Sequence, residues 1–186
     1  MKINLTSFLL SIFFILITAY GKCQNLVRPG FFTYNGATFK AELSTRNKDE
    51  LLIEPQNSPN LGENPKKIEG LDTNEVLSTL EVQNLYDYNA LLPLFSNYAT
   101  LKKDGEYIRI IFSINGDGVI NKMIFYIYGQ TKISQQDIGK FYQKIIVENK
   151  FRLTSKDDKH RPLKYIFRTK TIKFNTNYHV SRTRNN

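Results

Sequence analysis

The sequence predicts an α+β fold, with a small antiparallel sheet in β-β-α-β order, one covering helix and an additional β-hairpin nearer the N-terminus. Three observations support this class. Two apolar runs flank a glycine-rich turn between residues 107 and 128, an amphipathic helical pattern follows, and a third apolar run ends at Phe174. Thirteen Phe and eleven Tyr favour sheet, and 41% hydrophobic residues are ample for one packed core.

Residues 1–23 have the pattern of a secretory signal peptide. An uncharged, mostly apolar run from Ser7 to Ala19 is shorter than the roughly 20 residues of a membrane-spanning helix. Small residues allow cleavage after Gly21 or after Cys23, and we favour Cys23. We therefore expect a secreted or periplasmic protein. Two alternatives stay open: lipid attachment at Cys23, which is the sole cysteine, and an uncleaved membrane anchor.

A β-hairpin and a polar linker are expected over residues 24–72. The dipeptide Asn35-Gly36 stands between the apolar runs Gly30–Tyr34 and Ala37–Leu43. It favours a type I′ turn, because both central positions of that turn need positive φ. The segment Ser44–Asp72 holds three prolines, so we expect it to be mostly loop.

Residues 73–176 are expected to form the α+β domain, beginning with two short helices. Thr73 would cap a helix over Glu75–Leu80, and Pro93 suits the first turn of another near Leu91–Tyr98. These helices precede the central hairpin of the domain.

The central hairpin is predicted from alternation around a turn. Even-numbered residues of Tyr107–Ile114 share an apolar face, which indicates a half-buried strand. The turn is Asn115–Gly118, and the return strand is Val119–Tyr128. The same turn lacks the acidic positions of a calcium loop.

A helix and a last strand complete the domain. Ser134 and Asp137 have capping-box spacing for a helix over Gln135–Asn149. Its apolar stripe, expected to cover the sheet, is Ile138, Phe141, Tyr142 and Ile145, with Ile146 as a further candidate. Phe151 should plug the end of the helix. The last strand is Leu163–Phe174, and its alternation slips, which predicts a bulge near residues 168–171.

The sequence assigns no catalytic, metal-binding or cofactor-binding residue. His160 lies in a charged turn and His179 in the basic tail, neither beside a nucleophile motif. One cysteine and two distant histidines do not form a metal-ligand set. We therefore expect a protein that is not an enzyme and has no small-molecule substrate.

Positive charge is concentrated near the C-terminus. The formal net charge is +9, and the basic tail spans residues 177–186. A secreted basic protein is attracted to anionic polymers and lipid head groups. Because of the signal peptide, we do not expect a nucleic-acid partner.

The order of these motifs resembles the TonB C-terminal domain family. The stretch Ile108–Ile120 resembles the family's first hairpin, and the helix Gln135–Asn149 with its following Lys150-Phe151 resembles its helix and subsequent aromatic residue. His160–Ile166 and the ending Thr171–Phe174 are similar to its last strand. There is no long proline-rich spacer, so the chain looks like a stand-alone secreted relative rather than the energy transducer.

The resemblance implies a non-enzymatic envelope protein that binds a protein partner. Members of this family leave the last strand near a sheet edge, where an extended partner segment can pair with it. The residues carried over to this role are Lys164, Tyr165, Ile166, Phe167, Arg168, Lys170 and Ile172. The alternative function is a secreted structural or surface-binding protein that uses its basic C-terminal region on anionic polymers or lipid head groups.

Overall fold

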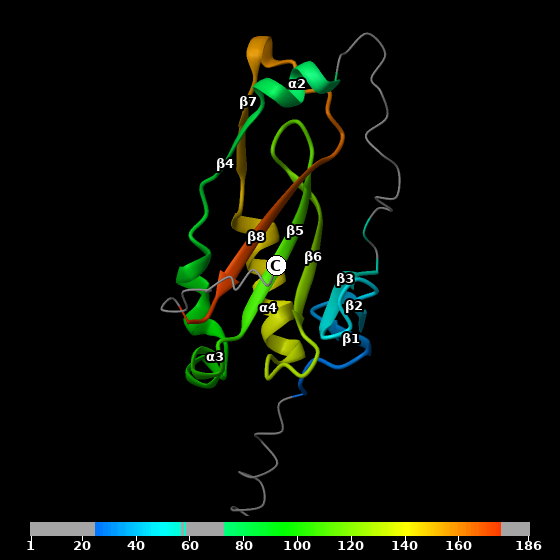
Figure 1. Cartoon of the computed structure of the whole chain (residues 1–186), viewed down its shortest axis with the longest axis vertical. Coiled ribbons are helices and arrows are strands. Elements are labelled where there is room, and N and C mark those ends of the chain that lie inside the picture. Colours follow the sequence, from blue (N-terminus) through cyan, green and yellow to red (C-terminus); the bar gives the residue numbers. More distant parts are fainter. Residues whose placement is uncertain (1–24, 57, 59–72, 176–186) are drawn as a thin grey trace, which may run out of the picture.

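The computed structural model describes residues 25–56, 58 and 73–175, which form a mixed α and β fold (Figure 1). The larger sheet is antiparallel, with strand order β1-β2-β3-β6-β5-β8 among the described residues. Its strands are β1 (Gly30–Tyr34), β2 (Ala37–Leu43), β3 (Glu50–Pro55), β5 (Tyr107–Ile114), β6 (Ile120–Tyr128) and β8 (Ile166–Lys173). A second sheet pairs β4 (Glu81–Asn84) with β7 (Phe151–Thr154).

One face of the larger sheet forms the core. The helices are α2 (Thr73–Thr79), η1 (Tyr88–Leu94), α3 (Tyr98–Asp104), α4 (Gln135–Glu148) and η2 (Lys156–Asp158). Helix α4 lies behind β5, β6 and β8 in Figure 1. It buries Ile138, Phe141 and Ile145 of the predicted stripe, whereas Tyr142 is partly buried and Ile146 is exposed. The buried sheet residues facing this side include Ile108, Ile110, Phe112, Ile114, Met123, Phe125 and Ile127.

The N-terminal hairpin is confirmed, and it belongs to the same sheet. Asn35 and Gly36 have φ of 44° and 80°, as a type I′ turn requires. The expectation of a loop after this hairpin is wrong at Glu50–Pro55, which forms β3. Leu51 and Ile53 are buried there, and β3 pairs with β6. Residues 57 and 59–72 of the expected linker lie outside the described residues.

The turn of the central hairpin needs its glycines because other segments of the backbone lie directly against it. Gly116 donates its N–H to the Leu163 carbonyl at 2.7 Å, and a Cβ there would collide with the backbone of residues 160 and 161. Gly118 has φ of 79°, and its Cβ would collide with the Phe151 carbonyl. The return strand begins one residue later than expected, and the register between β5 and β6 shifts at Ser113/Ile114.

Helix α4 has the predicted N-cap at Ser134, but the Asp137 side chain bonds to another segment of the chain. The Ser134 hydroxyl accepts the Asp137 N–H at 3.0 Å, as in a capping box. The buried Asp137 carboxylate accepts the Ser96 hydroxyl at 2.7 Å. The carboxylate therefore joins α4 to the segment after η1.

The helices before the central hairpin differ from the prediction. A 3-10 helix, η1, begins at Tyr88 with Asp87 as its cap, and Pro93 lies inside it rather than in a first turn. Helix α3 begins at Tyr98, where the predicted helix would end, and Gly105 with φ of 68° follows its last residue.

The segment after α4 also differs. Phe151 is buried, as expected for a plug, but it also begins β7. The predicted bulge near residues 168–171 is wrong, because β8 pairs with β5 in unbroken register from residue 166 to residue 173. The alternation slips because Arg168 and Lys170 occupy core-side positions at the sheet edge, where long side chains reach water.

No helix in the described ranges is long and apolar enough to cross a membrane. The predicted signal peptide, Cys23 and the basic tail lie outside the described residues.

Candidate functional site

Strand β8 is the last strand of the larger sheet in the described part of the chain. The Phe174 N–H donates to the Glu106 carbonyl at 3.0 Å, which places the even-numbered residues of β8 in the hydrogen-bonded pairs with β5. Hydrogen-bonded and non-hydrogen-bonded pairs alternate in an antiparallel ladder. The backbone N–H and C=O groups of Phe167, Thr169 and Thr171 therefore point away from β5, toward the open edge.

The side chains predicted to bind a partner fall into two groups. Ile166 and Ile172 are buried on the core side, so they hold β8 in place and offer no side-chain surface. Phe167 is 43% exposed, on the face of the sheet opposite α4. Arg168 donates from Nη1 to the Phe167 carbonyl at 2.9 Å, which satisfies one acceptor of the strand.

The other predicted residues lie on or before the strand. Lys170 is exposed at the edge. Lys164 is exposed and Tyr165 is half-buried, and both precede the first residue of β8. The structure thus places five of the seven predicted residues in the edge strand, where outward backbone groups and the side chains of Phe167, Arg168 and Lys170 are accessible.

A cluster of polar and aromatic residues lies on the face opposite α4, which we call the open face. The Glu50 carboxylate, only 4% exposed, accepts the Tyr107 hydroxyl and Arg109 Nη2, the latter at 2.7 Å. The Arg109 guanidinium lies over the Tyr126 ring at 4.6 Å, and the Tyr107 and Tyr128 rings meet edge to face with centroids 4.6 Å apart. These five residues form the Glu50 cluster.

The Glu50 cluster holds a neutral phenol and an incompletely paired guanidinium. Burial, then the hydrogen bond and charge of Glu50, raise the pKa of Tyr107 far above its ordinary value. The hydroxyl therefore stays protonated and donates. Arg109 Nε is buried without a hydrogen-bond partner in the described structure, an arrangement that is uncommon in folded proteins.

The sequence pattern placed four of these five residues on one side of their strands but did not indicate that they form a cluster. Alternation places Tyr107, Arg109, Tyr126 and Tyr128 on the outer side of their strands. Glu50 was missed because its strand was read as loop, and no local signal links it to a tyrosine 57 residues away.

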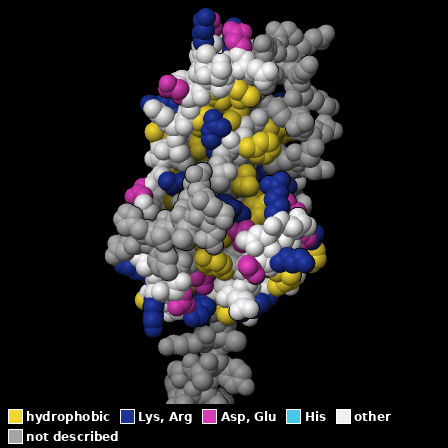
Figure 2. Space-filling model, in the orientation of Figure 1, with side chains coloured by type: hydrophobic (Ala, Val, Ile, Leu, Met, Phe, Trp, Pro, Cys, Tyr) yellow, Lys and Arg dark blue, Asp and Glu magenta, His cyan; other side chains and the backbone are white. Residues whose placement is uncertain are grey.

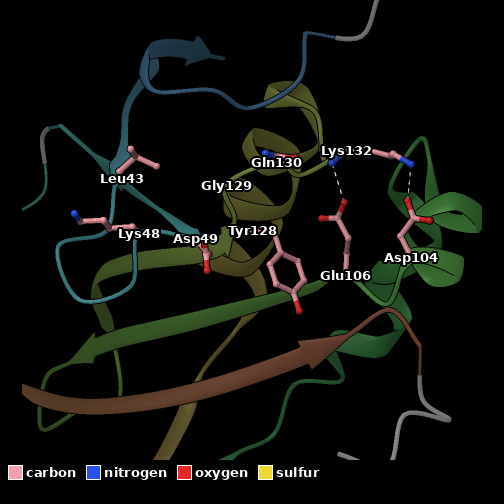
Figure 3. A pocket seen from close by; sticks show the side chains of 9 residues that line it. All are labelled: Leu43, Lys48, Asp49, Asp104, Glu106, Tyr128, Gly129, Gln130 and Lys132. Carbon is pink, nitrogen blue, oxygen red and sulfur yellow. Dashed lines mark hydrogen bonds and ion pairs between the residues drawn. The ribbon is translucent and has the colours of Figure 1, made fainter.

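Two hollows adjoin the Glu50 cluster. The first, about 460 Å³, is shown in Figure 3 and includes Tyr128, Asp104, Glu106 and Lys132 in its lining. Its charges largely satisfy one another: Lys132 Nζ binds Asp104 at 2.6 Å, and Glu106 accepts the Lys132 N–H at 2.8 Å. These bonds fix the segment between β6 and α4.

The second hollow, about 390 Å³, lies at the β8 side of the open face and shares Asp104 and Tyr128 with the first. Its further lining residues are Gly105, Tyr107, Arg109, Thr171, Lys173 and Asn175. Figure 2 shows basic and apolar side chains intermingled on the described part of the molecule seen from this side.

His160 has a local structural partner. Its backbone N–H donates to Ser155 Oγ at 3.0 Å, and its ring Nδ1 lies 2.8 Å from the same oxygen. These contacts close the turn after β7. His179 lies outside the described residues. Within the described ranges, no group of three His, Cys, Asp or Glu side chains is placed to hold a metal ion.

Comparisons with known proteins bear on the fold. No family model matches the chain. The chain is similar to a DUF5043 family protein from Bacteroides uniformis, with a TM-score of 0.50 and 13% sequence identity over 85% of this chain and 92% of that one. At this identity the likeness shows the fold alone.

A second similarity is to the myosin-2 heavy chain, non muscle, of Acanthamoeba castellanii. It is 25% identical over 157 residues, or 74% of this chain. The chain spans 10% of that protein's length, so the similarity concerns a small part of the myosin chain.

Proposed function

We propose that this chain is a non-enzymatic binding protein of the cell envelope that captures an extended segment of a protein partner along β8. The observation that supports the proposal is that β8 forms an edge of the larger sheet in the described part of the chain. Outward N–H groups at Phe167, Thr169 and Thr171, and outward C=O groups at Thr169 and Thr171, are placed to receive another strand.

Side-chain chemistry at the edge supports an acidic partner. Arg168 and Lys170 stand where a regular alternation would put apolar residues, and both reach solvent. Basic side chains on an edge discourage indiscriminate pairing and favour a complementary acidic segment. The proposal includes the sequence resemblance to the TonB C-terminal domain family. In its support, β8 lies beside β5, the strand with which that resemblance begins.

The test is a proline substitution that blocks the edge while leaving the sheet intact. Thr169→Pro removes an outward N–H but no hydrogen bond to β5, and proline is tolerated in edge strands. Thr169→Ala is the matched control, since it keeps the N–H. In capture from an envelope extract, we expect wild type and Thr169→Ala to recover the same partner and Thr169→Pro to lose it.

Hydrogen exchange separates edge pairing from other modes of binding. With the captured partner bound, the amides of Phe167, Thr169 and Thr171 should exchange at least ~10-fold more slowly, because they become hydrogen-bonded. Circular dichroism checks that each variant is folded. Equal capture by a folded Thr169→Pro variant, or binding without protection of these amides, would refute the proposal.

A further inference from the structure

We propose that the 390 Å³ hollow on the open face binds the carboxylate of a small organic acid whose body is aromatic or apolar. The acid is bound without being converted. This inference does not depend on strand capture at β8, because the hollow is lined by side chains of the open face rather than by the outward backbone groups.

The sheet register brings the necessary groups together. On the open face, Lys173 of β8 stands directly opposite Tyr107 of β5, and Thr171 stands opposite Arg109. Diagonal neighbours across an antiparallel pair are about 7–8 Å apart, within the reach of long side chains. An ammonium, a guanidinium and a hydroxyl therefore line the same hollow.

The negative charges that line or adjoin the hollow are already paired, whereas Lys173 is not paired with any described residue. Asp104 binds Lys132 at 2.6 Å, and Glu50 holds Arg109 at 2.7 Å. Lys173 forms no ion pair with any described residue, whereas the Arg109 guanidinium is held by Glu50 and its unpartnered Nε is buried. A carboxylate is the complementary group, since charge-assisted hydrogen bonds to lysine and arginine are stronger than neutral ones.

The walls of the hollow select the body of the ligand. Tyr107 and Tyr128 meet edge to face, and Tyr128 is 40% exposed. Ligand sites commonly combine aromatic walls with a few fixed polar groups, and their volumes begin at about 300 Å³. The hollow lies near that lower limit, which favours a compact monocarboxylate.

The charge requirement is tested with benzoate and benzamide, which have nearly the same shape. The two probes are titrated into the protein, and binding is followed by protein NMR. We expect benzoate to bind at least ~10-fold more tightly than benzamide, and Lys173→Gln to reduce that preference to within ~3-fold. Lys170→Gln is the control. It makes the same charge change on the opposite face of β8 and should keep the preference.

The aromatic requirement is tested with benzoate and acetate. Tyr128→Ala should weaken benzoate binding several-fold while leaving acetate nearly unchanged. Phe167→Ala, which removes an aromatic of similar exposure at the far end of β8, should affect neither probe.

N-acetylphenylalanine identifies the source of the carboxylate: tighter binding than benzoate assigns the site to a peptide C-terminus, and weaker binding assigns it to a free acid.

Two results would overturn the inference: equal affinity of wild type for benzoate and benzamide, or equal loss of the preference in Lys173→Gln and Lys170→Gln. The Thr169→Pro variant keeps this experiment distinct from strand capture. It should bind benzoate like wild type, because Thr169 does not line the hollow.

Discussion

Glu50 is a buried carboxylate on the side of the sheet that α4 does not cover. Its two donors, the Tyr107 hydroxyl and the Arg109 guanidinium, come from β5. Strand β6 lies between β5 and β3, the strand that carries Glu50. Burying an ion pair gives little net stability, because desolvation offsets the attraction, but removing one partner leaves the other charge uncompensated. The cluster is therefore better understood as a device that fixes the positions of Tyr107 and Arg109 than as a source of stability.

Glu50→Gln should destabilise the protein by about 1–3 kcal/mol. The amide can still accept a hydrogen bond but leaves the Arg109 charge unpaired, and the partial exposure of Arg109 limits the loss. Glu42→Gln is the control, because Glu42 pairs with Lys40 at the surface, and it should cost less than ~0.5 kcal/mol. Urea unfolding measures both. Equal effects would show that Glu50 behaves as an ordinary surface carboxylate.

At the scale of elements, the local sequence predicted secondary structure correctly where a segment's own residues determine its conformation. The Asn35-Gly36 turn, strand β5 and the α4 cap at Ser134 are of this kind. Strands β3 and β7 were not predicted, because four to six residues carry little periodicity and their partners lie far away in the sequence. Burial against β6 makes Leu51–Ile53 a strand, and no local pattern contains that information.

The two candidate sites also differ in how far the sequence could predict them. The edge role of β8 remains a proposal: its apolar residues predicted a strand, its interrupted alternation misleadingly predicted a bulge, and the edge residues came from the family resemblance. The open-face hollow was not readable, because Tyr107, Tyr128 and Lys173 come from three strands and meet only once the sheet order is known.

The contact between α4 and β1 depends on the lack of a side chain at Gly139. A Cβ there would overlap the base of the Tyr34 ring. Replacing a mid-helix glycine by alanine usually stabilises a helix by about 1 kcal/mol. Here we expect Gly139→Ala to destabilise the protein by about 1–3 kcal/mol, because overpacking exceeds the gain in helix propensity.

A double-mutant cycle measured by urea unfolding isolates this contact. In a Tyr34→Ala background, the overlap is absent, so Gly139→Ala should become neutral or stabilising, giving a coupling of about 1–4 kcal/mol. Additive effects of the two substitutions would show that Tyr34 does not limit the space at Gly139.

At the scale of the whole molecule, β3 connects the N-terminal hairpin to the rest of the chain. It pairs with β2 on one side and β6 on the other, so the sheet continues without a break from β1 to β8. Phe39 of the hairpin stacks on Phe32 and meets the ring of Tyr142 from α4. A shared sheet and a shared core are the conditions for cooperative unfolding.

Ile53→Ala tests this continuity. Ile53 is fully buried in β3, so the substitution should cost about 2–4 kcal/mol, whereas Leu52→Ala on the open face of the same strand should cost less than ~1.5 kcal/mol. If the sheet is one cooperative unit, far-UV circular dichroism and tyrosine fluorescence will show one coincident urea transition in the wild type and both variants. An early transition confined to residues 30–55, detected by hydrogen exchange in Ile53→Ala, would instead show that the hairpin unfolds on its own.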